Sequence, residues 1–223
     1  MLKNLDQHYT ANAIRTYTGK AFDITILDPK TICIEDIAHA LSRTPRWSGH
    51  TEKIFTVAQH SVLACLRATE KNKLAALLHD ASEAYLQDIA KPIKVLLPDY
   101  QRLEANLMDA IAFKFGFDLP LDEEVKLIDR ELLQVEWDMF VIPSKEEIED
   151  PYSVLPDFWS PDYAKEYFLG MYQQFKKYCD CGRIHENVPQ DGYEHYCSDC
   201  HKVIRDCLGP KPMDDNDYNC STL

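Results

Sequence analysis

The stretch Lys73–Lys94, KLAALLHDASEAYLQDIAKPIK, decides how the fold is interpreted. Its apolar residues recur at spacings of three and four, which predicts an amphipathic helix; they are Leu74, Leu77, Leu78, Ala81 and Tyr85. His79, Asp80 and Glu83 stand in this helix beside the apolar stripe, where polar groups are costly unless they are paired or bound to a metal. The stretch therefore predicts a helix that carries chemistry as well as packing.

Two further helical segments place a polar residue on an apolar face. In TVAQHSVLAC (56–65), His60 has Val57 and Leu63 one turn away on either side, although a core histidine bonded to the backbone would look the same. In EEVKLIDRELLQVE (123–136), Asp129 shares a face with apolar neighbours at positions 125, 132 and 133. A buried aspartate needs a strong partner. These segments predict that His60 and Asp129 join His79 and Asp80 in one interior.

The four residues form a plausible ligand set for a divalent cation. Two imidazoles and two carboxylates suit Mn, Fe, Co, Ni or Zn. Glu83 follows Asp80 by three residues and His79 by four, so helical spacing puts it on the same face. It could act as a base toward water or as an acid toward a leaving oxygen, and a solvated surface carboxylate is the alternative.

The rest of the chain predicts a mostly α-helical body. Residues 15–27 have the pattern of a β-hairpin around Gly19-Lys20, and further helices are expected over 32–43, 56–68, 98–116, 121–140 and 160–178. We expect one domain over residues 1–178 and a cysteine-rich tail over 179–223. Of the eight cysteines, six fall in that tail.

The tail has the spacing of a structural zinc site. Two close pairs, Cys179 with Cys181 and Cys197 with Cys200, are separated by 15 residues, as in a four-cysteine zinc ribbon or knuckle. His201 and Cys207 are possible substitutes. A site closed by four thiolates leaves no open position, so its role would be structural.

Composition restricts the class of partner. The formal net charge is −13, with 24 basic and 37 acidic residues among 223, which argues against a nucleic-acid partner. The amino terminus lacks the apolar core of a signal peptide, and no apolar run reaches membrane-spanning length. We expect a cytoplasmic protein without a membrane partner.

The combination of His60, His79-Asp80 and Asp129 resembles the ligand signature of the HD superfamily of metal-dependent phosphohydrolases. HDASEAYLQDIAKPIK (79–94) is similar to the segment found in bacterial 5′-deoxynucleotidases and in phage and prophage proteins that include dATP triphosphohydrolases. DIAHALSRTPRWSGHTEKIFTVAQHS (36–61) resembles the phage subgroup. The resemblance covers residues 15–178 and implies an HD-domain helical bundle.

The resemblance also implies substrate contacts. It assigns Arg46 to phosphate, Trp47 to packing near the sugar, and Asp88 to a sugar hydroxyl. It assigns Lys94 and Lys126 to phosphate binding. Trp47 could instead fill the core, and either lysine could be merely solvated. Gly49 and His50 stand in a region that differs between the monophosphate and triphosphate enzymes, which leaves the choice of base open.

These observations predict an enzyme that hydrolyses a phosphate ester of a deoxynucleotide. The phage-like segment, Lys94 and Lys126 favour a deoxynucleoside triphosphate, dATP first, with release of triphosphate. A 5′-deoxynucleotidase acting on monophosphates is the nearest alternative. A nucleotide-binding regulator without turnover, and an interaction module tethered by the zinc tail, are alternatives of other classes. We expect a homo-oligomer, in the host cytoplasm if the chain comes from a phage.

Overall fold

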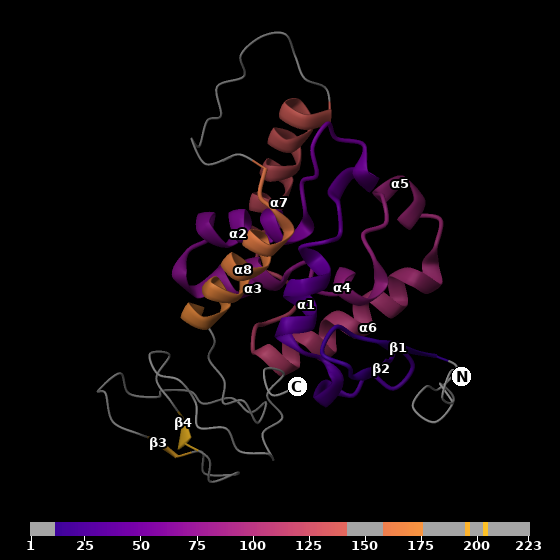
Figure 1. Ribbon diagram of the computed structural model, residues 1–223, viewed down its shortest axis with the longest axis vertical. Coiled ribbons are helices and arrows are strands. Elements are labelled where there is room, and N and C mark those ends of the chain that lie inside the picture. The colour runs from indigo at the N-terminus through magenta and orange to yellow at the C-terminus, as the bar shows by residue number, and fades with distance from the viewer. Residues whose placement is uncertain (1–11, 142–157, 176–194, 197–202, 205–223) are drawn as a thin grey trace.

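The computed structural model describes residues 12–141, 158–175, 195–196 and 203–204. The described body is mostly helical (Figure 1). Its helices are α1 (Ile34–Leu41), α2 (Val57–Arg67), α3 (Lys73–Leu78), α4 (Glu83–Leu86), α5 (Lys91–Lys94), α6 (Pro98–Phe115), α7 (Glu123–Glu136) and α8 (Pro161–Phe175). Short 3₁₀ turns are η2 (Pro29–Thr31), η3 (Arg46–Gly49) and η4 (Glu70–Asn72), and α7 runs on into a π-helical turn, η5 (Trp137–Val141).

The N-terminal hairpin predicted from the sequence is confirmed. Strands β1 (Ala13–Arg15) and β2 (Ala21–Asp23) pair antiparallel, with Ile14 opposite Phe22. Gly19 in the connecting turn has a φ of +87°, which glycine adopts without steric cost. Phe22 is 1% exposed and packs into the core, so the hairpin is fastened to the helical body by its inward face.

Helix α2 is the central helix of the body. All residues from 57 to 65 are buried, and α2 packs against α3, α7 and α8 (Figure 1). Val62 contributes to the larger hydrophobic cluster, while Leu63 belongs to a second cluster that it shares with Val125 and Leu132 of α7. A polar residue on α2 is therefore surrounded by protein, and His60 is such a residue.

The helix boundaries follow local capping chemistry. The Thr56 side chain accepts a hydrogen bond from the Gln59 amide at 3.2 Å and caps the start of α2. Gly116 ends α6 in the left-handed conformation, with φ +79°. The predicted helices over 32–43, 56–68 and 98–116 are thus confirmed, with ends shifted by one or two residues.

The stretch from Lys73 to Lys94 differs from the single helix that its periodicity predicts. Helix α3 ends at Leu78, and the amides of Ala81 and Glu83 bond to the carbonyls three residues earlier, at 3.0 Å each. These tighter bonds form a turn in place of the α-helical ladder. His79 and Asp80 lie in this turn, so they are held at a helix end and not along a helix face.

Outside the body, β3 (His195–Tyr196) and β4 (Val203–Ile204) pair antiparallel. The four predicted zinc ligands, Cys179, Cys181, Cys197 and Cys200, lie outside the described residues, and so does the boundary at residue 178. Among the described helices, none has both the length and the apolar character needed to cross a membrane.

Candidate metal centre

His60, His79 and Asp129 place their ligand atoms within 4.8 Å of one another, and Asp80 lies beside the two histidines. The Nε2 atom of His60 lies 3.1 Å from Nε2 of His79 and 3.2 Å from Oδ1 of Asp129. The same atom lies 3.7 Å from Oδ2 of Asp80. His79 Nε2 is in turn 3.2 Å from Asp80 Oδ2 and 3.7 Å from Asp129 Oδ1. The four residues that the sequence predicts as ligands are therefore brought together.

Three packed elements produce this convergence. His60 comes from the centre of α2, the His79-Asp80 pair from the turn after α3, and Asp129 from the middle of α7. Helix α2 packs against both α3 and α7. Near the start of α7, Glu124 accepts hydrogen bonds from the Thr69 amide and from the Asn72 side chain, which braces α7 against the segment before α3.

The separations fit a shared cation. Zinc and similar ions bind imidazole nitrogen and carboxylate oxygen at about 2.0–2.2 Å, so neighbouring ligand atoms are roughly 3 to 3.5 Å apart at tetrahedral or octahedral angles. The five observed distances, 3.1 to 3.7 Å, agree with that geometry. Exposure is graded across the cluster: the side chains of His60 and His79 are 0% and 5% exposed, and those of Asp80 and Asp129 are 21% and 41% exposed. The carboxylate side is therefore the side open to solvent and to a ligand.

The second nitrogen of each histidine has its own partner. His79 Nδ1 lies 2.7 Å from the Ala76 carbonyl oxygen, which can only accept, so Nδ1 donates and leaves Nε2 facing the cluster. His60 Nδ1 lies 2.6 Å from Oε1 of Glu136. Histidines that bind metals are held in this way, with the outer ring nitrogen donating to a carbonyl or carboxylate.

The charges of the cluster stabilise one another. Burial alone lowers the pKa of His79, but Asp80 and Asp129 outweigh burial and raise the pKa well above its ordinary value. Burial favours protonated Asp80, but His79 outweighs it and lowers the pKa of Asp80. The pKa of Asp129 is lowered as well, because its hydrogen bonds to His60 and His79 overcome burial. A bound cation would take the place of the proton that His79 carries.

Glu83 is buried beside the cluster, at the start of α4. It is 5% exposed, and its Oε2 atom has no hydrogen-bond partner within the described part of the chain. Burial raises its pKa well above the ordinary value, and the Asp80 and Asp88 charges add to the effect. The alternative of a solvated surface carboxylate is wrong. A buried carboxyl whose pKa is raised in this way is suited to proton transfer.

Comparison with known proteins gives the family. No protein-family model matches the chain. YfdR, an uncharacterized protein of Escherichia coli strain K12, is 40% identical to the chain over 123 residues, which cover 55% of the chain and 69% of YfdR. The chain belongs to the YfdR family. An uncharacterized protein of Rhodobacter capsulatus is 37% identical over 122 residues, which cover 50% of the chain and 62% of that protein.

The YfdR-family chain holds a buried glutamate that was not predicted from the sequence. Glu136 is 0% exposed and bonds to His60 through one oxygen and to Arg46 through the other, with Oε2 at 2.7 Å from Arg46 Nε. Glu136 follows Asp129 by seven residues, which is two helical turns, so the two share one face of α7. That spacing was the signal in the sequence that could have identified it.

Arg46 lies inside this network. Its side chain is 9% exposed, and its Nη1 atom is 3.5 Å from Oδ2 of Asp80. Burial opposes its charge, but Glu136 and Asp80 outweigh burial and raise its pKa. The residue assigned to phosphate by resemblance therefore makes two ion pairs with protein groups.

Trp47 and Ser48 have unusual backbone conformations. Their φ values are +58° and +52°, in the left-handed region that bulky side chains avoid at a cost of about 1–3 kcal/mol each. The Trp47 ring packs against Trp137 with centroids 5.3 Å apart, and its Nε1 is buried without a hydrogen-bond partner among the described residues. The packing of Trp47 against Trp137 holds this strained turn in place, and the turn positions the adjacent Arg46.

Asp88 and Lys94 lie on the α4–α5 side of the cluster. The pKa of Asp88 is raised by burial and by the Asp80 charge. Lys94 donates to Oε1 of Glu104 at 2.7 Å, and this pair outweighs burial and raises the pKa of Lys94. Gln87, with a φ of +69°, shapes the loop before Asp88, and its carbonyl accepts from the Tyr100 hydroxyl at 2.8 Å.

Lys126 is placed differently from the other predicted contacts. It donates to Oε1 of Glu123 at 2.6 Å, one turn earlier in α7, and its side chain is 42% exposed. Such a pair between exposed side chains contributes little to stability. Among the described residues, the partner of Lys126 is therefore Glu123 and not a member of the cluster.

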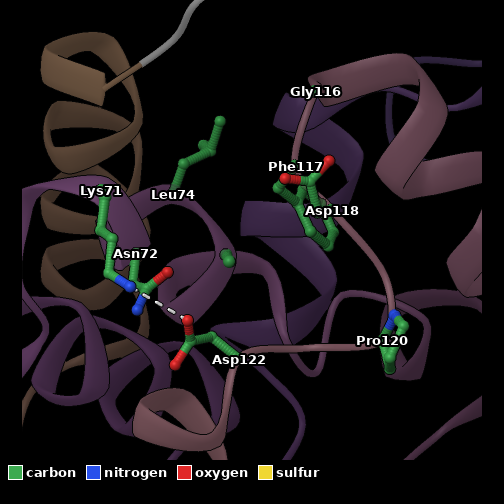
Figure 2. A pocket seen from close by; sticks show the side chains of 9 residues that line it. Lys71, Asn72, Leu74, Gly116, Phe117, Asp118, Pro120 and Asp122 are labelled. Atoms are coloured by element: carbon green, nitrogen blue, oxygen red, sulfur yellow. Dashed lines mark hydrogen bonds and ion pairs between the residues drawn. The ribbon is translucent and has the colours of Figure 1, made fainter.

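A separate pocket of about 180 Å³ lies between the start of α3 and the α6–α7 connection (Figure 2). Lys71 and Asp122 bridge one side of it at 3.1 Å, and Asn72 is bonded to Glu124. None of the predicted site residues lines it. Because Lys71 and Asn72 already have partners, the pocket does not compete with the His-Asp cluster as the candidate functional site.

Proposed function

We propose that this protein is a metal-dependent enzyme of the HD superfamily that hydrolyses a phosphate ester of a deoxynucleotide. The favoured substrate is a deoxynucleoside triphosphate, dATP first, and the products are the deoxynucleoside and triphosphate. One observation carries the proposal. The ligand atoms of His60, His79 and Asp129 lie within 4.8 Å of one another, Asp80 lies 3.2 Å from His79, and the buried carboxyl of Glu83 lies close to Asp80.

His60, His79, Asp80 and Asp129 would hold a divalent transition metal such as Zn, Co or Mn. When bound, such an ion supplies Lewis-acid polarisation of a phosphoryl oxygen and acidifies water. The protein's own contribution is to fix the four ligands before binding. The two histidines cannot rotate freely, because their Nδ1 atoms are bonded to Ala76 and Glu136.

Glu83 would carry the proton in the reaction. A water oxygen forms a bond to the α-phosphorus, and the bond from that phosphorus to the 5′ oxygen breaks. The Glu83 carboxyl, whose pKa is raised by burial, gives its proton to the departing 5′ oxygen. The resulting carboxylate then accepts the proton that the attacking water loses, so the group is restored at the end of each turnover.

Asp88, Trp47 and Lys94 would bind the substrate around this centre. Asp88 and Lys94 lie on the α4–α5 side, and Trp47 lies in η3 next to Arg46. The open carboxylate side of the cluster leaves room for a phosphate to approach. Aromatic and carboxylate groups suit a sugar, and a lysine suits phosphate.

One observation favours a second candidate, a 5′-deoxynucleotidase acting on deoxynucleoside monophosphates. The triphosphate assignment depends on two lysines, and the half-exposed Lys126 is bonded to the exposed Glu123 one turn earlier in α7. With Lys94 alone near the cluster, fewer cations would neutralise the additional phosphates. A monophosphate needs fewer such contacts.

Phosphorus NMR of the products distinguishes these candidates. We would incubate the full chain, loaded with Mn²⁺ or Co²⁺, with dATP and separately with dAMP, and use the His79→Ala variant as the inactive control. Triphosphate from dATP supports the first candidate, and inorganic phosphate from dAMP supports the second. Nucleotide binding without any product would overturn both and favour a regulator without turnover.

A further inference from the structure

Glu136 joins His60 to Arg46 at the buried side of the candidate metal centre. One carboxylate oxygen lies 2.6 Å from His60 Nδ1 and the other 2.7 Å from Arg46 Nε. Arg46 then reaches Asp80 through Nη1 at 3.5 Å. His60 and Asp80 meet again at the cluster, 3.7 Å apart. The four groups thus form a closed ring of polar contacts.

The ring is enclosed by the protein. Glu136 and His60 are 0% exposed and Arg46 is 8% exposed, so their contacts with one another are shielded from solvent. The two oxygens of Glu136 face Arg46 Nε and His60 Nδ1, so both are used by buried partners. A buried carboxylate that uses both oxygens on fixed partners is a rigid acceptor.

Neighbouring contacts hold the ring in place. The residues that follow Arg46 and Glu136 along the chain, Trp47 and Trp137, pack together with ring centroids 5.3 Å apart. Turn η3 and the end of α7 are therefore joined by an ion pair and an aromatic pair in succession. Because α7 also carries Asp129, this junction sets the position of one metal ligand and the orientation of another.

We propose that Glu136 is a positioning residue that orients His60 for the cation, with Arg46 as its partner on the other carboxyl oxygen. The proposal rests on the metal centre of the proposed function but not on the nucleotide substrate. Glu136 fixes His60 Nδ1 as the donor, which leaves Nε2 directed at the ligands. Outer partners of this kind change metal affinity by about 10- to 100-fold.

A matched pair of double variants separates orientation from folding. Arg46→Met with Glu136→Gln removes both charges but keeps an amide oxygen that can accept from His60. Arg46→Met with Glu136→Leu removes the charges and the acceptor alike. Losing one member of a buried ion pair leaves the other charge unpaired, which is why Arg46 is changed in both.

The probe is Co²⁺ alone, added to the metal-free full chain, with affinity and the visible absorption of bound cobalt as readouts. We expect the leucine variant to bind Co²⁺ about 10- to 100-fold more weakly than the glutamine variant, with an altered spectrum. Equal affinities and spectra in the two variants would overturn the proposal. Should the leucine variant fail to fold, Glu136→Asp, which keeps the charge but shortens the side chain, must weaken Co²⁺ binding, and unchanged binding would overturn the proposal.

The same titration distinguishes this proposal from the proposed function. A wild-type chain that binds no Co²⁺ overturns both, because there is then no centre to orient. A wild-type chain that binds Co²⁺ but hydrolyses neither dATP nor dAMP overturns the proposed function alone. The role of Glu136 would then be decided by the Co²⁺ affinities of the glutamine and leucine variants alone.

Discussion

Replacing Glu83 by methionine should make the protein more stable and, at the same time, nearly inactive. The side chain is 5% exposed, and its Oε2 has no hydrogen-bond partner within the described residues. An unsatisfied buried polar atom costs about 1–3 kcal/mol, which methionine, of similar length, would remove. For a chain of this size, 1 kcal/mol corresponds to roughly 2–4 °C in Tm, so Tm should rise by about 2–12 °C.

The gain in stability should depend on pH. Burial, Asp80 and Asp88 raise the folded-state pKa of Glu83 above its unfolded value. Protonated Glu83 therefore contributes its full stabilisation at a pH below its unfolded-state pKa. That stabilisation is lost as the pH rises through its folded-state pKa. Methionine does not titrate, so the metal-free variant should exceed wild type by more at pH 8 than at pH 5. Thermal melts in a chelator measure this, with the exposed Glu123→Met as the matched control.

Hydrolysis should fall by about 10²- to 10⁴-fold in the same variant, because general acid–base groups contribute that much. This loss corresponds to about 3–5 kcal/mol in the activation barrier. The cobalt content should stay unchanged. An unchanged or lower Tm would refute the burial argument, and unchanged turnover would refute the proton role. Loss of cobalt would make Glu83 a ligand.

Further predictions concern the metal, the lysines and the tail. His79→Ala and Asp129→Ala should each abolish metal binding and hydrolysis, and full activity in either would remove the central claim. Metal affinity should rise with pH through the raised pKa of His79, because the cation displaces its proton; titrations between pH 6 and 9 check the sign. Lys94→Ala should weaken the binding of dATP more than that of dAMP, whereas Lys126→Ala should change the binding of either nucleotide little. Binding assays in which Lys126→Ala has the larger effect would contradict this prediction. Truncation after Tyr178 should release one tightly held zinc and leave hydrolysis measurable by phosphorus NMR, unless the tail also supports the centre.

Local pattern was sufficient for most of the helices. The apolar spacing in α1, α2 and α6 repeats every three or four residues, and Thr56 caps the start of α2 while Gly116 caps the end of α6. These signals lie within a few residues of the structure they determine. The interruption after Leu78 was missed, because the apolar spacing continues through it to Tyr85 while the hydrogen bonds change from four residues to three.

The candidate ligands could also be predicted from the sequence. A histidine or aspartate on an apolar helix face needs a partner, and that argument selected His60, His79, Asp80 and Asp129, which the structure brings together. The degree to which each of these residues is buried was harder to predict from the sequence. Asp129 was expected on a buried face, but its side chain is 41% exposed and Leu133 is 38% exposed. How exposed a residue at the edge of the cluster is depends on which other segments pack over it. Those segments are distant in the sequence, so the spacing within one helix does not predict the exposure.

The sequence by itself determined which residues are chemically unusual, because helical spacing and the cost of burying charge act within one or two turns. Only the tertiary structure decided which of them meet. Glu136 bonds to a histidine 76 positions away and to an arginine 90 positions away. No periodicity extends over such distances; the packing of α2 against α7 creates the first contact, and the approach of η3 to the end of α7 creates the second. The physical reason is that a side chain's orientation within its helix is local, whereas the choice of its partner depends on how the whole chain packs.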